Sequence, residues 1–160
     1  MLVSSEANEL ADYFYFLTKL SVMVMNNTRS LTLDYAKSIA AAAEAEATRN
    51  GWAVVIAIVD AGGHLIHLLR RDNTQFGSIE VAIQKARAAV AFRRPTKVWD
   101  QHVGEGRLRY LGLPGTLPIE GGLPVVVQGE FIGAVGVSGV RSDEDAQVAQ
   151  AGLNALPANS

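Results

Sequence analysis

Two strand–turn–strand patterns stand on either side of a central helical pattern, and this order limits the chain to few architectures. The first pattern covers residues 52–70, where the turn residues Asp60-Ala-Gly-Gly63 separate two runs of mainly aliphatic residues. The second covers residues 125–137 around Gln128-Gly129, and residues 78–92 between the two patterns have helical spacing. We therefore predict an α+β fold with one mostly antiparallel sheet, and we exclude a doubly wound parallel fold.

Further helices are predicted at both ends of this core. The alanine-rich segment Thr32–Asn50 has a threonine as its expected N-cap, and Gly51 is the expected terminator. Ser142 and Asp145 have the spacing of a capping box, which predicts a last helix that continues to Leu156.

The connection between the central helix and the second hairpin is predicted to be mostly irregular. Pro95 stops the central helix, and Thr96 is the expected cap of a short helix that ends near His102. Glycine and proline dominate residues 103–122, so we predict a long loop there, and long loops in compact domains are often functional.

Length and composition favour one folded domain and exclude several classes of function. The chain has 160 residues, of which 49% are apolar and 19% are charged, which fits a single packed core. Its formal net charge of −2 gives no basic field for nucleic acid or anionic lipid. No cysteine is present, which excludes disulfides, thiolate metal sites and a cysteine nucleophile, and no metal site is predicted.

The first thirty residues are predicted to be a separate extension, and residues 31–160 are predicted to be the domain. The apolar run at residues 11–25 contains Asp12 and Lys19, so it is a poor membrane span or signal peptide. Its apolar residues recur mostly at three and four positions, which favours an amphipathic helix docked on the domain or on a sister subunit. We expect a cytoplasmic protein with no membrane partner.

The three histidines are candidate ligands of the nitrogen type. His64 and His67 lie three positions apart in a predicted strand and point to opposite faces, so they cannot chelate one ion without a bulge. Each has a structural or solvent-facing interpretation, but His64, beside a glycine turn, is also a candidate ligand-binding residue. His102, near the long loop, is a candidate general base or axial ligand.

Cations on the central helix suggest an anion site. Lys85 and Arg87 lie about 200° apart around the helix, so they cannot both be buried in one core. One is predicted to point toward Gly121 and Gly122, whose backbone N–H groups suit an anionic ligand. Arg93 adds positive charge, and an arginine fork binds carboxylates in bidentate fashion. Ion pairs with nearby surface carboxylates remain the alternative.

Glu120 is the candidate proton-transfer group. It precedes the Gly-Gly turn between the apolar residues Ile119 and Leu123. If it is partly desolvated there, its pKa is expected to rise, and it could act as a general base. An exposed turn carboxylate is the alternative interpretation.

The glycines at positions 133, 136 and 139 lie inside a predicted strand, so they do not form a dinucleotide-binding turn. Their expected role is to let another backbone approach closely, either from a helix that crosses the sheet or from a second copy of the chain.

Four sequence blocks in this order resemble the GlcG/HbpS family, which itself resembles the C-terminal domain of PduO-type cobalamin adenosyltransferases. The resemblance covers roughly residues 31–156, and its blocks are these: Val59-Asp-Ala-Gly-Gly63; Ser78-Ile-Glu-Val-Ala82 with Lys85-Ala-Arg-Ala-Ala89 and Phe92-Arg-Arg-Pro-Thr96; Leu117-Pro-Ile-Glu-Gly-Gly-Leu-Pro124; and Gly133-Ala-Val-Gly-Val-Ser-Gly139.

The resemblance implies a profilin-like domain with a five-stranded antiparallel sheet flanked by helices, assembled as a homo-oligomer from dimer to octamer. It also implies a small-molecule-binding domain, with haem or a related tetrapyrrole as the leading ligand. The alternative is a cofactor-free enzyme that acts on a small organic acid, in which Arg87 or Arg93 holds the carboxylate and Glu120 or His102 moves a proton. For either function we expect a pocket near the long loop and the end of the central helix, shared with a neighbouring subunit.

Overall fold

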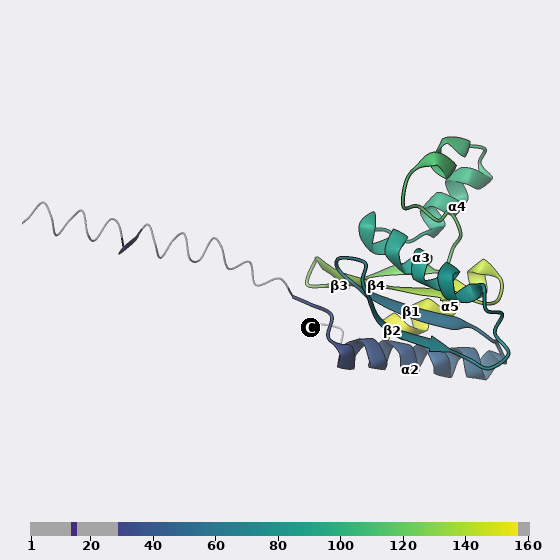
Figure 1. The fold of residues 1–160 in the computed structure, drawn as a ribbon, viewed down its shortest axis with the longest axis horizontal. Coiled ribbons are helices and arrows are strands. Elements are labelled where there is room, and N and C mark those ends of the chain that lie inside the picture. Colours follow the sequence, from purple (N-terminus) through teal and green to yellow (C-terminus); the bar gives the residue numbers. More distant parts are fainter. Residues whose placement is uncertain (1–13, 16–28, 157–160) are drawn as a thin grey trace, which may run out of the picture.

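The computed structural model describes residues 14–15 and 29–156, and the second range forms a sheet with helices on both of its faces (Figure 1). In chain order the elements are α2 (Leu33–Asn50), β1 (Val55–Asp60), β2 (Leu65–Arg70), α3 (Ser78–Ala91), α4 (Lys97–Gly104), the 3-10 helix η1 (Leu108–Gly112), β3 (Gly122–Val127), β4 (Glu130–Ser138) and α5 (Ser142–Leu153). The predicted mixture of helices with an antiparallel sheet is confirmed.

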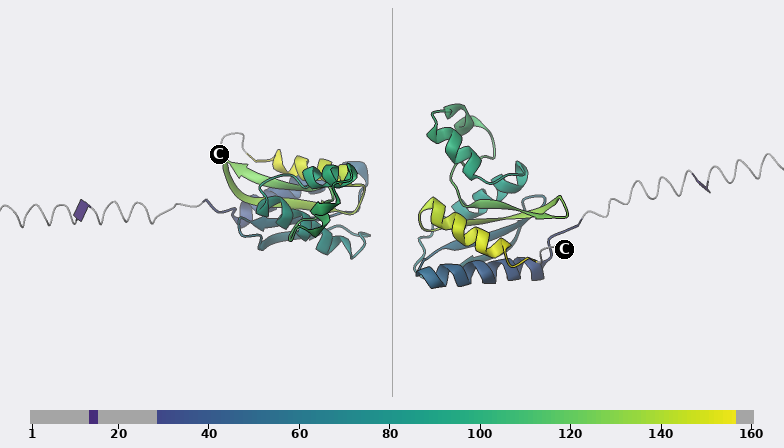
Figure 2. Two further views of the ribbon diagram at one scale, coloured as in Figure 1. Left: turned by 90° about the horizontal axis from the view of Figure 1, so that it is seen from above. Right: turned by 180° about the vertical axis from the view of Figure 1, so that it is seen from behind.

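The sheet has the strand order β2-β1-β4-β3, and every neighbouring pair is antiparallel. Alternate residues of β1 face opposite layers: Ile56 and Ile58 pack in the cluster formed with α2 and α5, whereas Ala57 and Val59 pack against α3. Figure 2 shows α2 and α5 on one face of the sheet and α3 on the other. Both faces of β1 are therefore buried.

The fifth strand that the resemblance implies is not confirmed, because the described residues form a sheet of four strands. Residues 113–121, which precede β3, contain two prolines and two glycines. Proline cannot donate a hydrogen bond to a ladder, and glycine weakens a strand. The segment contacts the sheet at its last residue, where the Gly121 carbonyl accepts from the Val137 N–H at 3.0 Å, and β3 begins at Gly122.

Gly136 lets α3 lie directly against β4. A Cβ atom at this position would overlap the carbonyl oxygen of Ala82 and would lie 2.5 Å from the backbone nitrogen of Ala86. The predicted role of this glycine, close approach of a crossing helix, is confirmed. The helix backbone and the strand backbone are thus in contact without an intervening side chain.

A buried ion pair connects α3 to the opposite layer. The Lys85 side chain is 1% exposed, and its Nζ donates to Oδ2 of Asp145 at 2.8 Å and to the carbonyl oxygen of Val137 at 2.9 Å. Burial raises the pKa of the Asp145 carboxyl, and the Lys85 ammonium and the Val140 N–H oppose this rise. Lys85 therefore joins α3, β4 and α5 inside the protein.

An arm made of α4 and η1, residues 97–112, projects from the sandwich beyond the end of α3 (Figures 1 and 2). Its base is joined to β3 by two hydrogen bonds: the Thr96 N–H donates to the Gly122 carbonyl at 3.0 Å, and the Gly122 N–H donates to Thr96 Oγ1 at 2.9 Å. Thr96 is the N-cap residue of α4, as predicted, but its side chain makes no capping hydrogen bond, because its hydroxyl oxygen accepts from β3 instead.

The long loop and the last helix also differ from the predictions. The segment expected to be an irregular loop contains η1, a short 3-10 helix. The capping box of α5 is not formed by Ser142 and Asp145: the Glu144 carboxylate accepts from the Arg141 N–H at 3.1 Å, while Asp145 is directed to Lys85. The helix ends at Leu153.

Within the described ranges, no helix combines the length and the apolar composition needed to cross a membrane. The predicted N-terminal helix lies outside the described residues apart from positions 14 and 15.

The Lys85–Asp145 pair gives a prediction about stability. Replacing Lys85 with Met leaves a buried carboxylate without its cation, which we expect to lower the free energy of unfolding by about 3–5 kcal/mol. The pKa of Asp145 should then rise further. The folded state would favour the protonated acid, so the stability of the variant should decrease as the pH rises above the ordinary value of 3.8. Urea denaturation across this pH range measures both effects.

Lys97→Met is the matched control, since this lysine is 52% exposed in its pair with Glu120 and should cost less than about 1 kcal/mol. The double variant Lys85→Met with Asp145→Asn should recover part of the loss, because it removes the charge and keeps an acceptor for Val140. Equal stability of Lys85→Met and Lys97→Met would contradict this account.

The close approach at Gly136 gives a second prediction. Gly136→Ala places a methyl group against the backbone of α3, and we expect a loss of at least about 3 kcal/mol or failure to fold. Gly104→Ala is the control, because nothing lies within 4 Å of a Cβ atom at this helical position. Thermal unfolding should show the control at or slightly above the parent, since alanine favours helix.

Candidate functional site

The turn between β1 and β2 is organised by the carboxylate of Asp60. Its Oδ1 accepts from the backbone N–H of Gly62 at 2.8 Å and from that of His64 at 2.9 Å. Gly63, at φ 80°, supplies the left-handed conformation that the turn needs. The carboxylate therefore holds the backbone on both sides of the Gly-Gly pair.

The same carboxylate orients the His64 imidazole. Nδ1 of His64 lies 3.2 Å from Oδ1 and 3.3 Å from Oδ2 of Asp60, and the histidine side chain is 82% exposed. An ionised carboxylate is only an acceptor, so Nδ1 carries the proton and the lone pair of a neutral ring is on Nε2. In its neutral form, the side chain thus directs the lone pair of Nε2 to solvent or to a ligand.

Asp60 is held in its ionised form. Desolvation acts to raise the pKa of Asp60, but the N–H groups of His64 and Gly62 and the imidazole outweigh it, so the pKa is lowered from its ordinary value. Asp60 therefore keeps its negative charge, and the charged carboxylate keeps the His64 ring in its orientation.

A hollow beside this turn contains two of the predicted ligand-binding residues, His64 and Arg87. Its volume is about 370 Å³, and it is open to solvent. We call it the turn hollow, and it is lined by Ala61, Gly62, Gly63, His64, Arg87, Val90 and Ala91.

Arg87 supplies the positive charge of the turn hollow. Its Nε donates to the Gly63 carbonyl at 3.0 Å, which fixes the base of the guanidinium against the turn. The side chain is exposed, and Nε–H is one of its five donors. No described residue accepts from its terminal N–H groups, which suit an anionic group. Val90 and Ala91, from the last turn of α3, give the hollow an apolar side.

The turn hollow can therefore bind a ligand at two points. The imidazole of His64 can bind a metal ion of the ligand, and the guanidinium of Arg87 can bind a carboxylate of the ligand. In the described part of the chain, no three His, Asp or Glu side chains are grouped so that they could hold a metal ion. A metal at His64 would have to arrive with its other ligands already in place.

His102 lies in the arm, within a cluster of aromatic rings. Its ring stacks on Tyr110 with centroids 4.9 Å apart, and Trp99 packs edge-on to Phe92 at 5.3 Å. The Nδ1 of His102 and the Nε1 of Trp99 are buried without a hydrogen-bond partner among the described residues. This cluster gives the arm a small core of its own.

The predicted residues around the long loop have partners within the protein. Glu120, with its side chain 17% exposed, forms an ion pair with Lys97 at 3.0 Å, and its backbone N–H donates to Asp100 at 2.9 Å. Arg93 lies 5.6 Å from the centre of the Phe131 ring, in a cation–π contact. Their predicted roles in proton transfer and ligand binding remain predictions.

Lys85, Gly121 and Gly122 meet one another, but inside the protein. A Cβ atom at Gly121 would lie 2.8 Å from Nζ of Lys85, and one at Gly122 would overlap the Lys85 carbonyl oxygen. The Gly122 N–H, expected to face an anion, donates to Thr96. The structure thus brings His64 and Arg87 together at the surface, and places Lys85 with the two glycines in the interior.

Sequence reasoning missed the role of Asp60. The signal was present in Asp60-Ala-Gly-Gly-His64, because an aspartate before a tight turn often accepts from backbone N–H groups a few residues later. The sequence also did not identify Val90 and Ala91 of α3 as lining residues of the turn hollow, because their helical spacing is equally typical of core residues.

The four-stranded antiparallel sheet, the helices on both faces and the Asp-Ala-Gly-Gly-His turn beside α3 define a small α+β domain with an open hollow beside that turn. The profile of the family described as "Haem degrading protein HbpS-like" matches residues 31–154. The chain belongs to this family.

Among individual relatives, Protein GlcG of Escherichia coli strain K12 is 44% identical over 108 residues, which cover 68% of this chain and 81% of that protein. A crystal structure of a double mutant of HbpS from Streptomyces reticuli is 34% identical, with a TM-score of 0.75, and covers 81% of this chain and 89% of that one. The crystal structure of a complex of PduOC with haem is 27% identical, with a TM-score of 0.73, and covers 80% of this chain and 96% of that one.

The Asp60–His64 contact gives a prediction that needs no ligand. The neutral imidazole of His64 should carry its proton on Nδ1, and in Asp60→Asn the Nε2–H form should become more populated, because the amide no longer requires a donor. Nitrogen NMR chemical shifts of the ring distinguish the two forms. His67 is the internal control and should not change; a His64 ring protonated on Nε2 in the parent protein would contradict the assignment.

Acid stability tests the charge of Asp60. Because its pKa is lowered on folding, the carboxylate stabilises the folded state above its ordinary pKa of 3.8, and this contribution is lost as the pH falls through the lowered value. The difference in free energy of unfolding between the parent and Asp60→Asn should therefore shrink on acidification. A difference that is constant with pH would show that the charge contributes nothing.

Proposed function

We propose that this protein is a small-molecule-binding domain that binds haem or a related tetrapyrrole at the turn hollow. The observation that carries the proposal is the His64 ring, which is held by Asp60 through Nδ1 and leaves Nε2 open beside the guanidinium of Arg87. A histidine oriented by a carboxylate is the usual arrangement of a metal-ligating imidazole.

The residues of the turn hollow fit the chemistry of such a ligand. His64 would bind the iron, Arg87 would bind a propionate through its terminal N–H groups, and Val90 would contact the edge of the macrocycle. Bound haem would supply a redox-active iron, and the protein would tune it through the imidazole and its carboxylate partner.

The hollow is open, so a tetrapyrrole seated there would expose much of its surface unless another surface covered it. A neighbouring copy of the chain is the proposed cover, within a homo-oligomer. The arm supports this proposal, because it carries large apolar side chains that are unusually exposed for a single chain, with Leu108 at 61% and Leu111 at 60%.

The comparisons support the same class of ligand. The family description names haem degradation, and one structural relative was solved as a complex with haem. Fold similarity alone does not transfer a ligand, so the weight of the proposal rests on His64 and Arg87.

The enzyme alternative has less support from the geometry. In the described residues, Arg87 forms no hydrogen bond or ion pair with Glu120 or His102, and Glu120 is paired with Lys97. Acid–base catalysis on a small organic acid in the cytoplasm therefore remains a hypothesis without a specific observation in its favour.

A visible titration with haemin tests the proposal. The parent protein should give a shifted Soret band that saturates, and His64→Ala should remove the shift. Asp60→Asn should weaken the affinity by about tenfold, in line with the loss of a metal-orienting partner, and Arg87→Gln should do so by a similar factor. The control is His67→Ala, which alters the other histidine of the same hairpin.

Two outcomes would overturn the assignment. Equal binding by the parent and His64→Ala would exclude His64 as the axial ligand. Loss of the band in His102→Ala, with His64→Ala unaffected, would move the site to the arm.

A further inference from the structure

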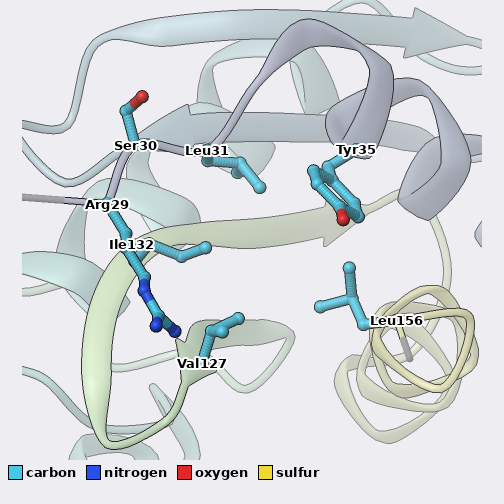
Figure 3. A pocket seen from close by; sticks show the side chains of 7 residues that line it. All are labelled: Arg29, Ser30, Leu31, Tyr35, Val127, Ile132 and Leu156. Atoms are coloured by element: carbon cyan, nitrogen blue, oxygen red, sulfur yellow. The ribbon is translucent and has the colours of Figure 1, made fainter. Parts of the chain in front are cut away.

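A second cavity lies away from the turn hollow, where the beginning of α2, the β3–β4 hairpin and the end of the described chain meet (Figure 3). Its volume is about 260 Å³, and it shares no residue with the turn hollow. We call it the hairpin cavity, and it is lined by Arg29, Ser30, Leu31, Tyr35, Val127, Ile132 and Leu156.

The interior of the hairpin cavity is apolar and well fixed. Leu31 is 4% exposed and Ile132 is 7% exposed, and both belong to the main core, against which Val127 and Leu156 pack. A Cβ atom at Gly133 would lie 2.8 Å from Cδ2 of Leu31, so the glycine makes room for the leucine against β4. The walls are thus part of the folded core rather than loose surface.

Two of the three polar lining residues, Arg29 and Tyr35, flank this apolar interior. Figure 3 shows Arg29 on one side of the cavity and the Tyr35 ring on the other, with Leu31 and Ile132 between them. Arg29 is exposed and Tyr35 is 45% exposed. Among the described residues, neither the guanidinium of Arg29 nor the hydroxyl of Tyr35 has a hydrogen-bond or ion-pair partner.

We infer that the hairpin cavity binds a small monocarboxylic acid with an apolar chain. The chain would fill the space among Leu31, Val127, Ile132 and Leu156, and the carboxylate would pair with Arg29 as a bidentate ion pair. This inference is independent of the proposed function, because it uses none of the residues of the turn hollow.

Size and charge select this class over others. A cavity of 260 Å³ holds about eight groups of the volume of a water molecule, which suits a saturated chain of about six to eight carbons. A nucleotide would bring several charges and a polar base to a cavity whose described lining has one cation, Arg29, and is otherwise mostly apolar. The cavity is also smaller than the turn hollow and contains no histidine, so it is not a second site for haem.

The probe is sodium octanoate, compared with 1-octanol, which has the same chain without the charge. In methyl-labelled full-length protein, octanoate should shift the NMR signals of Leu31, Val127 and Ile132 in a saturable manner, with an affinity at least about tenfold higher than that of octanol. In Arg29→Gln this preference should disappear, while octanol binds as before. Arg49→Gln changes another exposed arginine, at the end of α2, and should keep the preference.

Three results would overturn the inference: no methyl shifts at millimolar octanoate, equal affinity for octanoate and octanol in the parent protein, or an unchanged preference in Arg29→Gln. Because Arg29 is exposed, its replacement should leave the fold intact, and circular dichroism would verify this. Haemin titrations of the same Arg29→Gln protein should match the parent, so failure of one proposal would not be mistaken for failure of the other.

Discussion

The contact between α3 and β4 is the constraint on which the rest of the structure depends. Because Gly136 has no side chain, the backbone of α3 packs directly against the backbone of β4. This short distance between helix and strand allows the Lys85 side chain to reach Asp145 of α5. The ion pair then joins α3 to α5, which lie on opposite faces of the sheet. Burying a lysine is costly unless its charge is matched, so the glycine and the ion pair are parts of one arrangement.

The surface chemistry follows from this buried arrangement. Arg87 is two residues beyond Lys85, so it points away from the core, and the fixed position of α3 brings it to the Gly63 carbonyl. β1 carries Asp60 to the same place, and its carboxylate sets the ring of His64. His64 and Arg87 therefore line the same hollow because the packing of α3 on the sheet places Arg87 beside the β1–β2 turn.

Local patterns predicted most elements, since periodicity and turn residues are properties of neighbouring positions. The hairpins, the alanine-rich helix and its termination at Gly51, which has φ 68°, follow from such signals. Partners distant in sequence could not be predicted in this way: nothing near Lys85 identifies Asp145, 60 residues later. For the same reason the sequence did not identify Lys97 as the partner of Glu120, 23 residues later.

The arm has a consequence for how such a chain can diversify. Its aromatic rings pack mainly among themselves, and paired hydrogen bonds between Thr96 and Gly122 tie its base to the sheet. Substitutions, insertions or deletions within η1 would leave the sheet and the helices beneath it undisturbed, whereas Gly121 lies against Lys85 and has to stay a glycine. Related proteins could thus differ in the sequence and length of this arm, and in what it binds, while they keep the same sheet and the same packed helices.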